Sequence, residues 1–230
     1  MTSREFRERL SRRAGKADVL LSTPIVEQLE AYYRLLARWN RTINLTAFQL
    51  DEFNGQAVDR LLVEPLAAAR FVPDSPLVWF DLGSGGGSPA VPLKIVRPAA
   101  SLTMVESKTR KVAFLREVVR TLGFATTSVE NARFEEVAAS AAADGAAELV
   151  TTRAVKADGN LFSVARALLR EGGRLALFRT SASPIAPPRG FRLLETAQIA
   201  GLGRASQIVL FQRNNENVPR GTNAPILQRH

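Results

Sequence analysis

A glycine-rich segment that directly follows an apolar run is the part of this chain best suited to chemistry. Asp81–Gly87 reads DLGSGGG and overlaps the end of the run Leu77–Leu82. Glycines allow a tight turn and a close approach of backbone to ligand, and the helix that follows offers free N–H groups. Gly83 and Gly85 fit the dinucleotide fingerprint, but Ser88 stands where its third glycine would be. The segment predicts a ligand-binding loop, with a tight turn that binds nothing as the alternative.

An acidic residue follows this loop at the spacing typical of a ribose contact. Glu106 ends the second predicted strand, 19 residues after Gly87. A carboxylate there can accept hydrogen bonds from both ribose hydroxyls, whereas an NADP enzyme would favour Arg. Glu106 therefore indicates an unphosphorylated ribose, unless it is only a solvated carboxylate at a helix start.

The residue types that are missing restrict the reaction. The chain has no Cys and its one His is His230, the last residue, which argues against thiol catalysis, a Ser-His-Asp triad and a His-rich metal site. The only tyrosines, Tyr32 and Tyr33, lack the Lys four residues later that short-chain dehydrogenases use, and no G-x-x-x-x-G-K-[ST] loop occurs. Methyl transfer remains, because S-adenosylmethionine (SAM) carries the activated group and the protein mainly aligns the reactants. The complete D-x-G-x-G-x-G pattern resembles the first motif of SAM methyltransferases.

Composition indicates an anionic partner. The 230 residues include 31 Lys and Arg against 22 Asp and Glu, which gives a net charge of +9 and a pI near 10.9. Nucleic acid is the commonest partner of such a chain, and a solubilising surface is the alternative. No apolar run reaches the roughly 18 residues of a membrane span, and the N-terminus lacks a signal-peptide core. We expect a cytoplasmic protein that binds no membrane and no metal.

The elements that must position these residues alternate between strands and helices. Residues 1–70 are expected to form a helical N-terminal extension, residues 71–212 the ligand-binding domain, and residues 213–230 a disordered tail. The alternation predicts an α/β fold with a doubly wound, mainly parallel sheet. The strands are expected at 77–82, 101–106, 126–130, 148–153 and 173–178, with late antiparallel strands at 191–200 and 206–212.

Helical periodicity and capping signals place the helices. Thr23 is expected to cap a helix that runs to about Trp39, with Pro24 in its first turn. A second helix is expected over residues 50–70. In the helix expected over residues 108–122, Glu117 faces water. Further helices are expected at 91–96, 134–147 and 161–170.

Five segments, taken together, resemble the motifs of one known family. They read WNRTINLT (39–46), DLGSGGGSPAVP (81–92), VESKTRKVAFL (105–115), NARFEE (131–136) and TRAV (152–155). Over roughly residues 30–180 the chain is similar to the RsmG (GidB) family of 16S ribosomal RNA methyltransferases. The resemblance implies a Rossmann-like class I methyltransferase that transfers methyl from SAM to N7 of one guanine in 16S rRNA.

The resemblance also implies site residues. Gly83, Gly85 and Ser88 would bind the cofactor through the loop, and Glu106 would hold its ribose. Phe134 and Glu135 would flank the adenine, with a solvated helix start as the alternative for the carboxylate. Arg153 would lie beside SAM and face the RNA, with a structural ion pair as the alternative. No general base is assigned, because N7 of guanine carries no proton to remove.

The chain departs from the family pattern at three places. Ala90 stands where most members have Gly. Asp59 and Arg60 open the stretch in which the family has a His and an Asp-Ser pair. The fifth strand ends Phe178-Arg179, where the family often has Lys-Gly, and Arg179 is a candidate to supply that charge to the RNA.

The sequence therefore predicts a SAM-dependent rRNA (guanine-N7) methyltransferase, whose partner is 16S rRNA or the small ribosomal subunit. A monomer is favoured. A Rossmann-like methyltransferase that acts on a small molecule or a protein is one alternative. A catalytically inactive relative that still binds RNA is the other.

Overall fold

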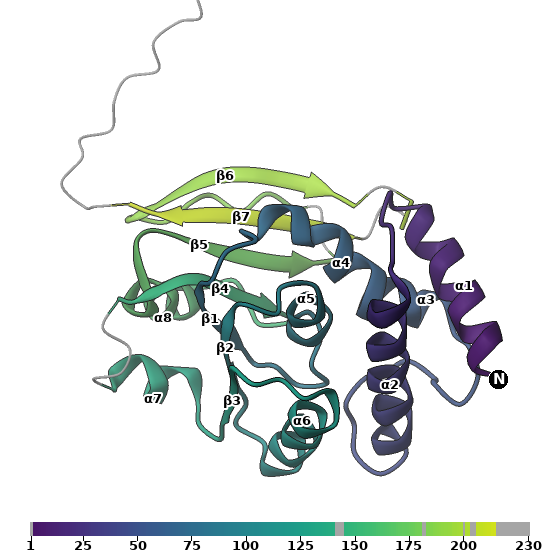
Figure 1. The fold of residues 1–230 in the computed structure, drawn as a ribbon. Coiled ribbons are helices and arrows are strands. Elements are labelled where there is room, and N and C mark those ends of the chain that lie inside the picture. The colour runs from purple at the N-terminus through teal and green to yellow at the C-terminus, as the bar shows by residue number, and fades with distance from the viewer. Residues whose placement is uncertain (1, 141–144, 181–182, 200, 203–205, 215–230) are drawn as a thin grey trace, which may run out of the picture.

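A seven-stranded sheet runs through the protein, with helices on both of its faces (Figure 1). The computed structural model describes residues 2–140, 145–180, 183–199, 201–202 and 206–214. The expected tail, residues 213–230, lies outside this range except for its first two residues. No described helix is both long enough and apolar enough to cross a membrane.

The strand order confirms the doubly wound fold. The sheet reads β3-β2-β1-β4-β5-β7-β6, with the first five strands parallel and β7 antiparallel to both of its neighbours. Chain order reverses between β1 and β4, which is where open α/β sheets form a ligand crevice. The strands are β1 (Val78–Leu82), β2 (Ser101–Val105), β3 (Thr127–Glu130), β4 (Ala147–Arg153), β5 (Leu169–Arg179), β6 (Phe191–Gln198) and β7 (Gln207–Arg213).

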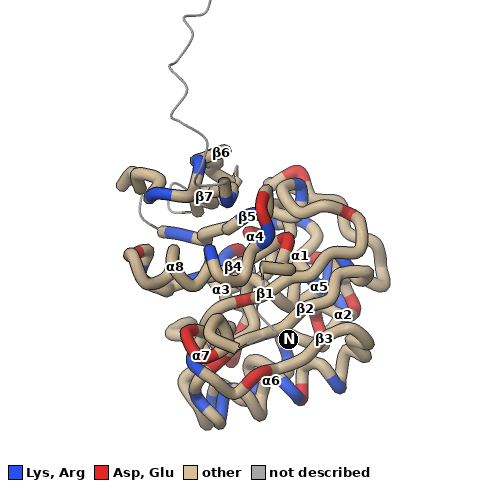
Figure 2. Tube along the Cα trace, turned by 90° about the vertical axis from the view of Figure 1, so that its left-hand side faces the viewer, with Lys and Arg blue, Asp and Glu red and all other residues tan. Residues whose placement is uncertain are grey.

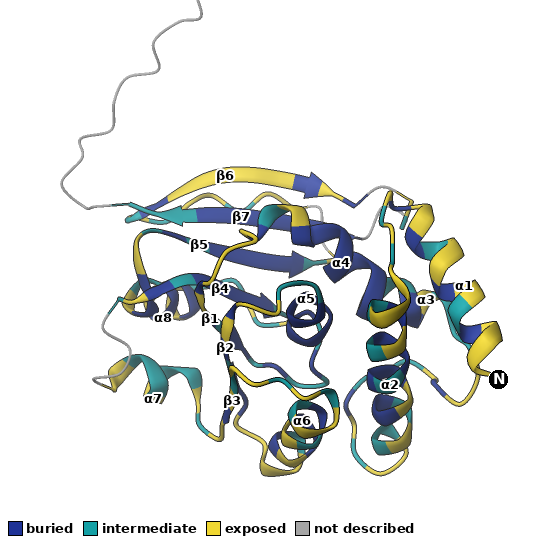
Figure 3. Cartoon of the chain, viewed as in Figure 1, coloured by how far each residue is buried: buried dark blue, intermediate teal, exposed yellow. Residues whose placement is uncertain are grey.

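Successive side chains of the central strands point to opposite faces of the sheet, and each face has its own hydrophobic core. In β5, Leu175 and Leu177 join the core under α7 and α8, whereas Ala176 and Phe178 join the core under α2, α5 and α6. From Leu175 to Phe178 both faces of this strand are buried (Figure 3), as expected where helices cover both sides of a sheet. The helices are α2 (Thr23–Asn40), α5 (Ala90–Val96), α6 (Thr109–Leu122), α7 (Phe134–Ala139) and α8 (Gly159–Leu168).

The N-terminal helices share a core with the sheet. Helix α1 (Ser3–Gly15) buries Phe6 and Leu10 in the same cluster that contains Trp79 of β1. Its start carries a capping box, in which the side chains of Thr2 and Glu5 each accept a backbone N–H of the other residue. The sequence predicted a helical extension here without placing this helix, although T-x-x-E is a recognisable signal for the start of a helix.

The expected helix over residues 50–70 is interrupted. It begins at Gly55, capped by the Asn54 side chain, and comprises α3 (Gly55–Val58), a π-helical turn (Asp59–Val63), α4 (Glu64–Ala68) and a 3₁₀ turn (Ala69–Phe71). Pro65 has no N–H, so it cannot bond the carbonyl four residues earlier. That carbonyl, of Leu61, accepts a hydrogen bond of 2.9 Å from the Ser88 hydroxyl instead.

Four local expectations were wrong. The helix expected over residues 134–147 ends at Ala139, and Ala147 already begins β4. Ser22, not Thr23, occupies the N-cap of α2, and no side chain caps that end. The helix expected over residues 161–170 ends at Leu168, because Leu169 already belongs to β5. Glu117 was expected to face water, but α2 packs against α6 at this place. The Glu117 carboxylate accepts a hydrogen bond of 2.7 Å from Trp39 Nε1.

Candidate functional site

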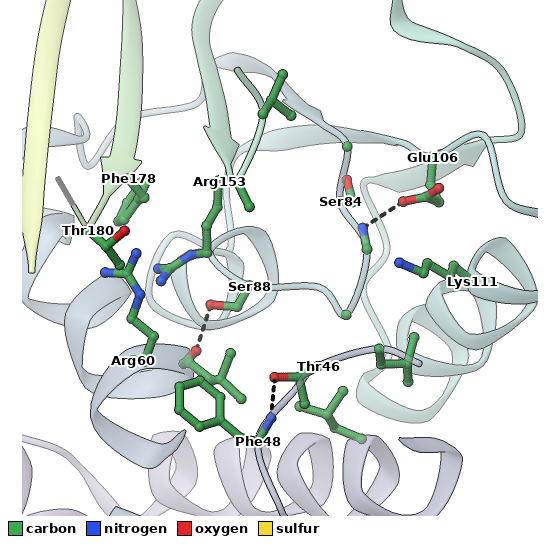
Figure 4. Close-up of a pocket in the computed structure, with 18 of the residues that line it drawn as sticks. Thr46, Phe48, Arg60, Ser84, Ser88, Glu106, Lys111, Arg153, Phe178 and Thr180 are labelled. Carbon is green, nitrogen blue, oxygen red and sulfur yellow. Dashed lines mark hydrogen bonds between the residues drawn. The ribbon is translucent and has the colours of Figure 1, made fainter. Parts of the chain in front are cut away.

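A cavity of about 830 Å³ opens where the parallel strands end (Figure 4). Segments that follow β1, β2, β4 and β5 line it, together with the helical segments before the sheet. This is the edge at which doubly wound sheets bind ligands. Among its lining residues are Thr46, Phe48, Arg60, Gly83, Gly85, Ser88, Glu106, Lys111, Arg153, Phe178 and Arg179.

The glycine loop takes a shape that other residues would disturb. Gly83, Gly85 and Gly87 all have positive φ. A Cβ on Gly87 would lie 2.9 Å from Val91 Cγ2, and Tyr32 lies 3.3 Å away on the same side. The loop is therefore packed against α5 and α2.

Glu106 organises the same loop from the end of β2. Its carboxylate accepts backbone hydrogen bonds from Gly85 N–H at 3.0 Å and from Lys108 N–H at 2.9 Å. The side chain is buried and lines the cavity. Because each carboxylate oxygen has a second lone pair, Glu106 keeps acceptor capacity for a ligand hydroxyl.

Asp81 lies buried beneath the loop, and the sequence reading gave it no separate role. Its Oδ1 accepts a hydrogen bond of 2.5 Å from Thr151 Oγ1, which accepts one of 2.8 Å from Trp79 Nε1. Its Oδ2 has no hydrogen-bond partner in the part of the chain that the structure describes. Burial raises the pKa of Asp81 to about 6, although Thr151, Ser84 and Arg153 oppose the shift.

The opposite end of the cavity is cationic. Arg153 follows the buried part of β4, and its Nη1 donates to Glu64 Oε2 at 2.7 Å. Arg60 donates to the other oxygen of the same carboxylate. Figure 4 shows Arg60 and Arg153 pointing toward one another beside Phe178, on the side away from Glu106. The ion-pair alternative for Arg153 is therefore what the structure shows, and the residue lines the cavity as well.

Five of the seven expected site residues line the cavity: Gly83, Gly85, Ser88, Glu106 and Arg153. Phe134 and Glu135 do not line it. They begin α7, and Glu135 accepts a hydrogen bond of 2.8 Å from Asn160 of α8, which holds the carboxylate against that helix. The Ser88 hydroxyl donates its hydrogen bond to the backbone carbonyl of Leu61.

Several residues that line the cavity were not predicted from the sequence to be site residues. Phe48 and Thr46 come from the loop after α2, and Lys111 from the first turn of α6. Glu64 does not itself line the cavity, and no sequence signal places it beside Arg153. Among the described residues, no group of three or more His, Asp or Glu side chains is arranged to hold a metal ion.

The cavity fits SAM in size and chemistry. Its volume lies within the range typical of small-molecule sites. A carboxylate with spare acceptor capacity lies at one end, together with a loop in which three glycines have positive φ. The other end holds the Arg153 guanidinium, two of whose nitrogens have no hydrogen-bond partner among the described residues.

Comparisons with known proteins show which family the chain resembles. The sequence model of a family described as rRNA small subunit methyltransferase G (GidB) matches residues 25–185. A ribosomal RNA small subunit methyltransferase G of Halorhodospira halophila is 34% identical over 206 residues, which cover 86% of this chain and 94% of that protein. One of Xylella fastidiosa is 41% identical over 161 residues, covering 69% and 71%.

A solved structure supports the fold. A SAM-dependent methyltransferase of Aquifex aeolicus resembles the chain with a TM-score of 0.52 at 12% identity, over 68% of this chain and 92% of that one. At this identity the likeness speaks for the fold alone.

Proposed function

Because the chain belongs to the rRNA small subunit methyltransferase G family, we propose that it transfers the methyl group of SAM to N7 of one guanine in 16S rRNA. The observation that carries the proposal is the two-ended cavity at the switch between β1 and β4. Glu106 and the glycine loop form one end, and Arg153 and Phe178 form the other.

The glycine-loop end is proposed to hold the cofactor. Glu106 accepts hydrogen bonds from the ribose hydroxyls with the lone pairs that Gly85 and Lys108 leave free. Gly83 and Gly85 let the backbone approach the cofactor, and Ser88 lines the wall next to them. The adenine contacts of Phe134 and Glu135 stay a prediction, since neither residue lines the cavity.

The cationic end is proposed to receive the base. When bound, SAM supplies an electrophilic methyl group, and N7 of guanine has a free lone pair to accept it. No proton leaves N7, so the protein needs no general base and acts by alignment. The Arg153 guanidinium donates to guanine O6, which lies next to N7 on the same edge of the base.

Basic residues around the cavity are proposed to bind the RNA backbone. Lys111, Lys156 and Arg179 line it. Elsewhere the Lys and Arg positions are spread over most elements (Figure 2), so the net charge of +9 is not gathered on one face. Contacts to phosphates make binding weaken as salt concentration rises.

Two measurements test the proposal. Calorimetry with SAM should show binding, and absence of binding would leave only the inactive RNA-binding relative. Incubation with labelled SAM and small ribosomal subunits that lack N7-methylguanine should place the label at N7 of one guanine in 16S rRNA. Binding of SAM with no label in RNA would contradict the proposal and favour a small-molecule or protein substrate.

A further inference from the structure

A single buried carboxylate holds two arginines at the cationic end of the cavity. Glu64 is fully buried, and each of its two oxygens accepts a hydrogen bond from a different guanidinium, that of Arg60 or that of Arg153. The two arginine side chains are also largely buried. With the carboxylate ionised, the group carries one net positive charge at the cavity wall.

The helix geometry around Glu64 explains why the carboxylate reaches this place. Arg60 lies in the π-helical turn Asp59–Val63, and Glu64 follows it directly, with its backbone N–H bonded to the Asp59 carbonyl. A π-helical turn adds a residue to the helical repeat and occurs often at functional sites. Glu64 directly follows this turn and accepts a hydrogen bond from Arg153 at the end of β4, so the N-terminal helices contribute to the substrate end of the cavity.

Arg153 is held in place, but not all of its N–H groups have a hydrogen-bond acceptor among the described residues. Its Nη1 binds Glu64, and its Cζ lies 5.1 Å from the centre of the Phe178 ring. Its Nε and Nη2 are buried and have no partner in the described part of the chain. Buried N–H donors without an acceptor are costly, and such a group calls for an explanation. An acceptor on a substrate in the cavity would supply one.

We propose that Glu64 is a positioning residue, which fixes the Arg153 guanidinium at the wall of the cavity so that this side chain meets the acceptor edge of the substrate base. Arg60 neutralises the carboxylate from its other side and thereby allows it to remain buried. This inference rests on the proposed transfer of a methyl group to guanine. It adds that the catalytic geometry depends on a carboxylate which itself contacts neither cofactor nor base.

A second buried carboxylate provides a control outside the cavity, with arginines that are more exposed than Arg60 and Arg153. Glu30 is also buried and also accepts one arginine on each oxygen, from Arg7 at 3.0 Å and from Arg34 at 2.8 Å. It joins α1 to α2 and does not line the cavity. Glu30→Gln therefore reports what the loss of a buried two-arginine carboxylate does to the fold alone.

The test compares the wild type with Glu64→Gln, Glu64→Asp and Glu30→Gln in steady-state methylation of undermethylated small subunits. We expect Glu64→Gln to lower kcat by roughly 10- to 100-fold, as misplaced orienting groups do. The Kd for SAM, measured by calorimetry, should stay within about twofold. Glu30→Gln should lower the midpoint of thermal unfolding but leave kcat unchanged.

Glu64→Asp keeps the charge but retracts the carboxylate by one methylene, so it guards against the case in which Glu64→Gln does not fold. We expect it to fold and bind SAM, yet to lose at least about fivefold in kcat. Wild-type kcat in a folded Glu64→Asp variant would overturn the inference, as would equal losses in Glu64→Gln and Glu30→Gln. If the wild type itself fails to methylate the subunit, the proposed function fails instead, so the two failures are distinguishable.

Discussion

The Tyr32 hydroxyl donates a hydrogen bond of 2.6 Å to the backbone carbonyl of Gly86. Tyr32 is fully buried in α2, and Gly86 lies in the glycine loop that lines the cavity. A helix that precedes the sheet thus supports the loop from below. The N-terminal helices are part of the site, because they hold the loop that is proposed to bind the cofactor.

Tyr32→Phe should weaken both the fold and cofactor binding. The change removes one buried hydrogen bond and leaves the Gly86 carbonyl without that partner, which costs about 1–2 kcal/mol of unfolding free energy. Calorimetry should show a lower affinity for SAM. Tyr33→Phe is the control, since Tyr33 packs against Phe6 rather than the loop. Equal SAM affinities in both variants would contradict a supporting role for Tyr32.

Gly87→Ala should abolish measurable SAM binding. The added Cβ would lie 2.9 Å from Val91 Cγ2, and φ is +88°. Gly123→Ala separates the two effects, because Gly123 also has positive φ but nothing lies within 4 Å of its Cβ position. Both variants should lose about 1 kcal/mol from backbone strain. Only Gly87→Ala should lose more than this in urea unfolding and also lose SAM binding.

Glu106→Gln should lower SAM affinity by roughly 10-fold or more. The amide places an N–H₂ group where a carboxylate oxygen now accepts from Gly85 or Lys108, which leaves buried donors facing each other. Glu130→Gln is the control, since Glu130 ends the neighbouring strand β3 and its side chain is exposed. Isothermal titration of both variants with SAM measures the difference. Unchanged affinity in Glu106→Gln would remove the ribose assignment.

Asp81 should make stability fall as pH rises from about 4 to 6. Burial raises the pKa of Asp81 from 3.8 to about 6, so in this window the folded state keeps a proton that the unfolded state has released. The loss amounts to about 3 kcal/mol when it is complete above pH 6, and it is absent below pH 4. Asp81→Asn lacks this titration. Urea unfolding of the wild type and Asp81→Asn between pH 4 and 7 should give diverging curves, and parallel curves would contradict the assignment.

Arg179→Ala should weaken RNA binding and spare SAM binding. Arg179 lines the cavity at the end of β5, and its Nη1 donates to the Ser183 carbonyl at 2.8 Å. Loss of one phosphate contact should reduce the slope of log affinity against log salt concentration by about 1. Arg120→Ala, which removes an exposed arginine on α6, is the control. RNA affinity equal to that of the wild type would exclude Arg179 as a contact.

The sequence alone determined the sheet and the loop. The alternation of strand and helix segments predicted five parallel strands, and the apolar run 77–82 indicated a strand buried on both faces. The late antiparallel pair was also confirmed. Gly83, Gly85 and Glu106 were found because each lies at a fixed distance from a strand end, and the carboxyl ends of parallel strands meet at one edge.

Only the tertiary structure decided which residues complete the site. Glu64 and Arg153 are 89 residues apart in the sequence, and Tyr32 and Gly86 are 54 apart, yet each pair is joined by one hydrogen bond. No periodicity encodes such contacts. They depend on a π-helical turn, a proline and the packing of helices against the sheet, which together determine where side chains from separate elements meet.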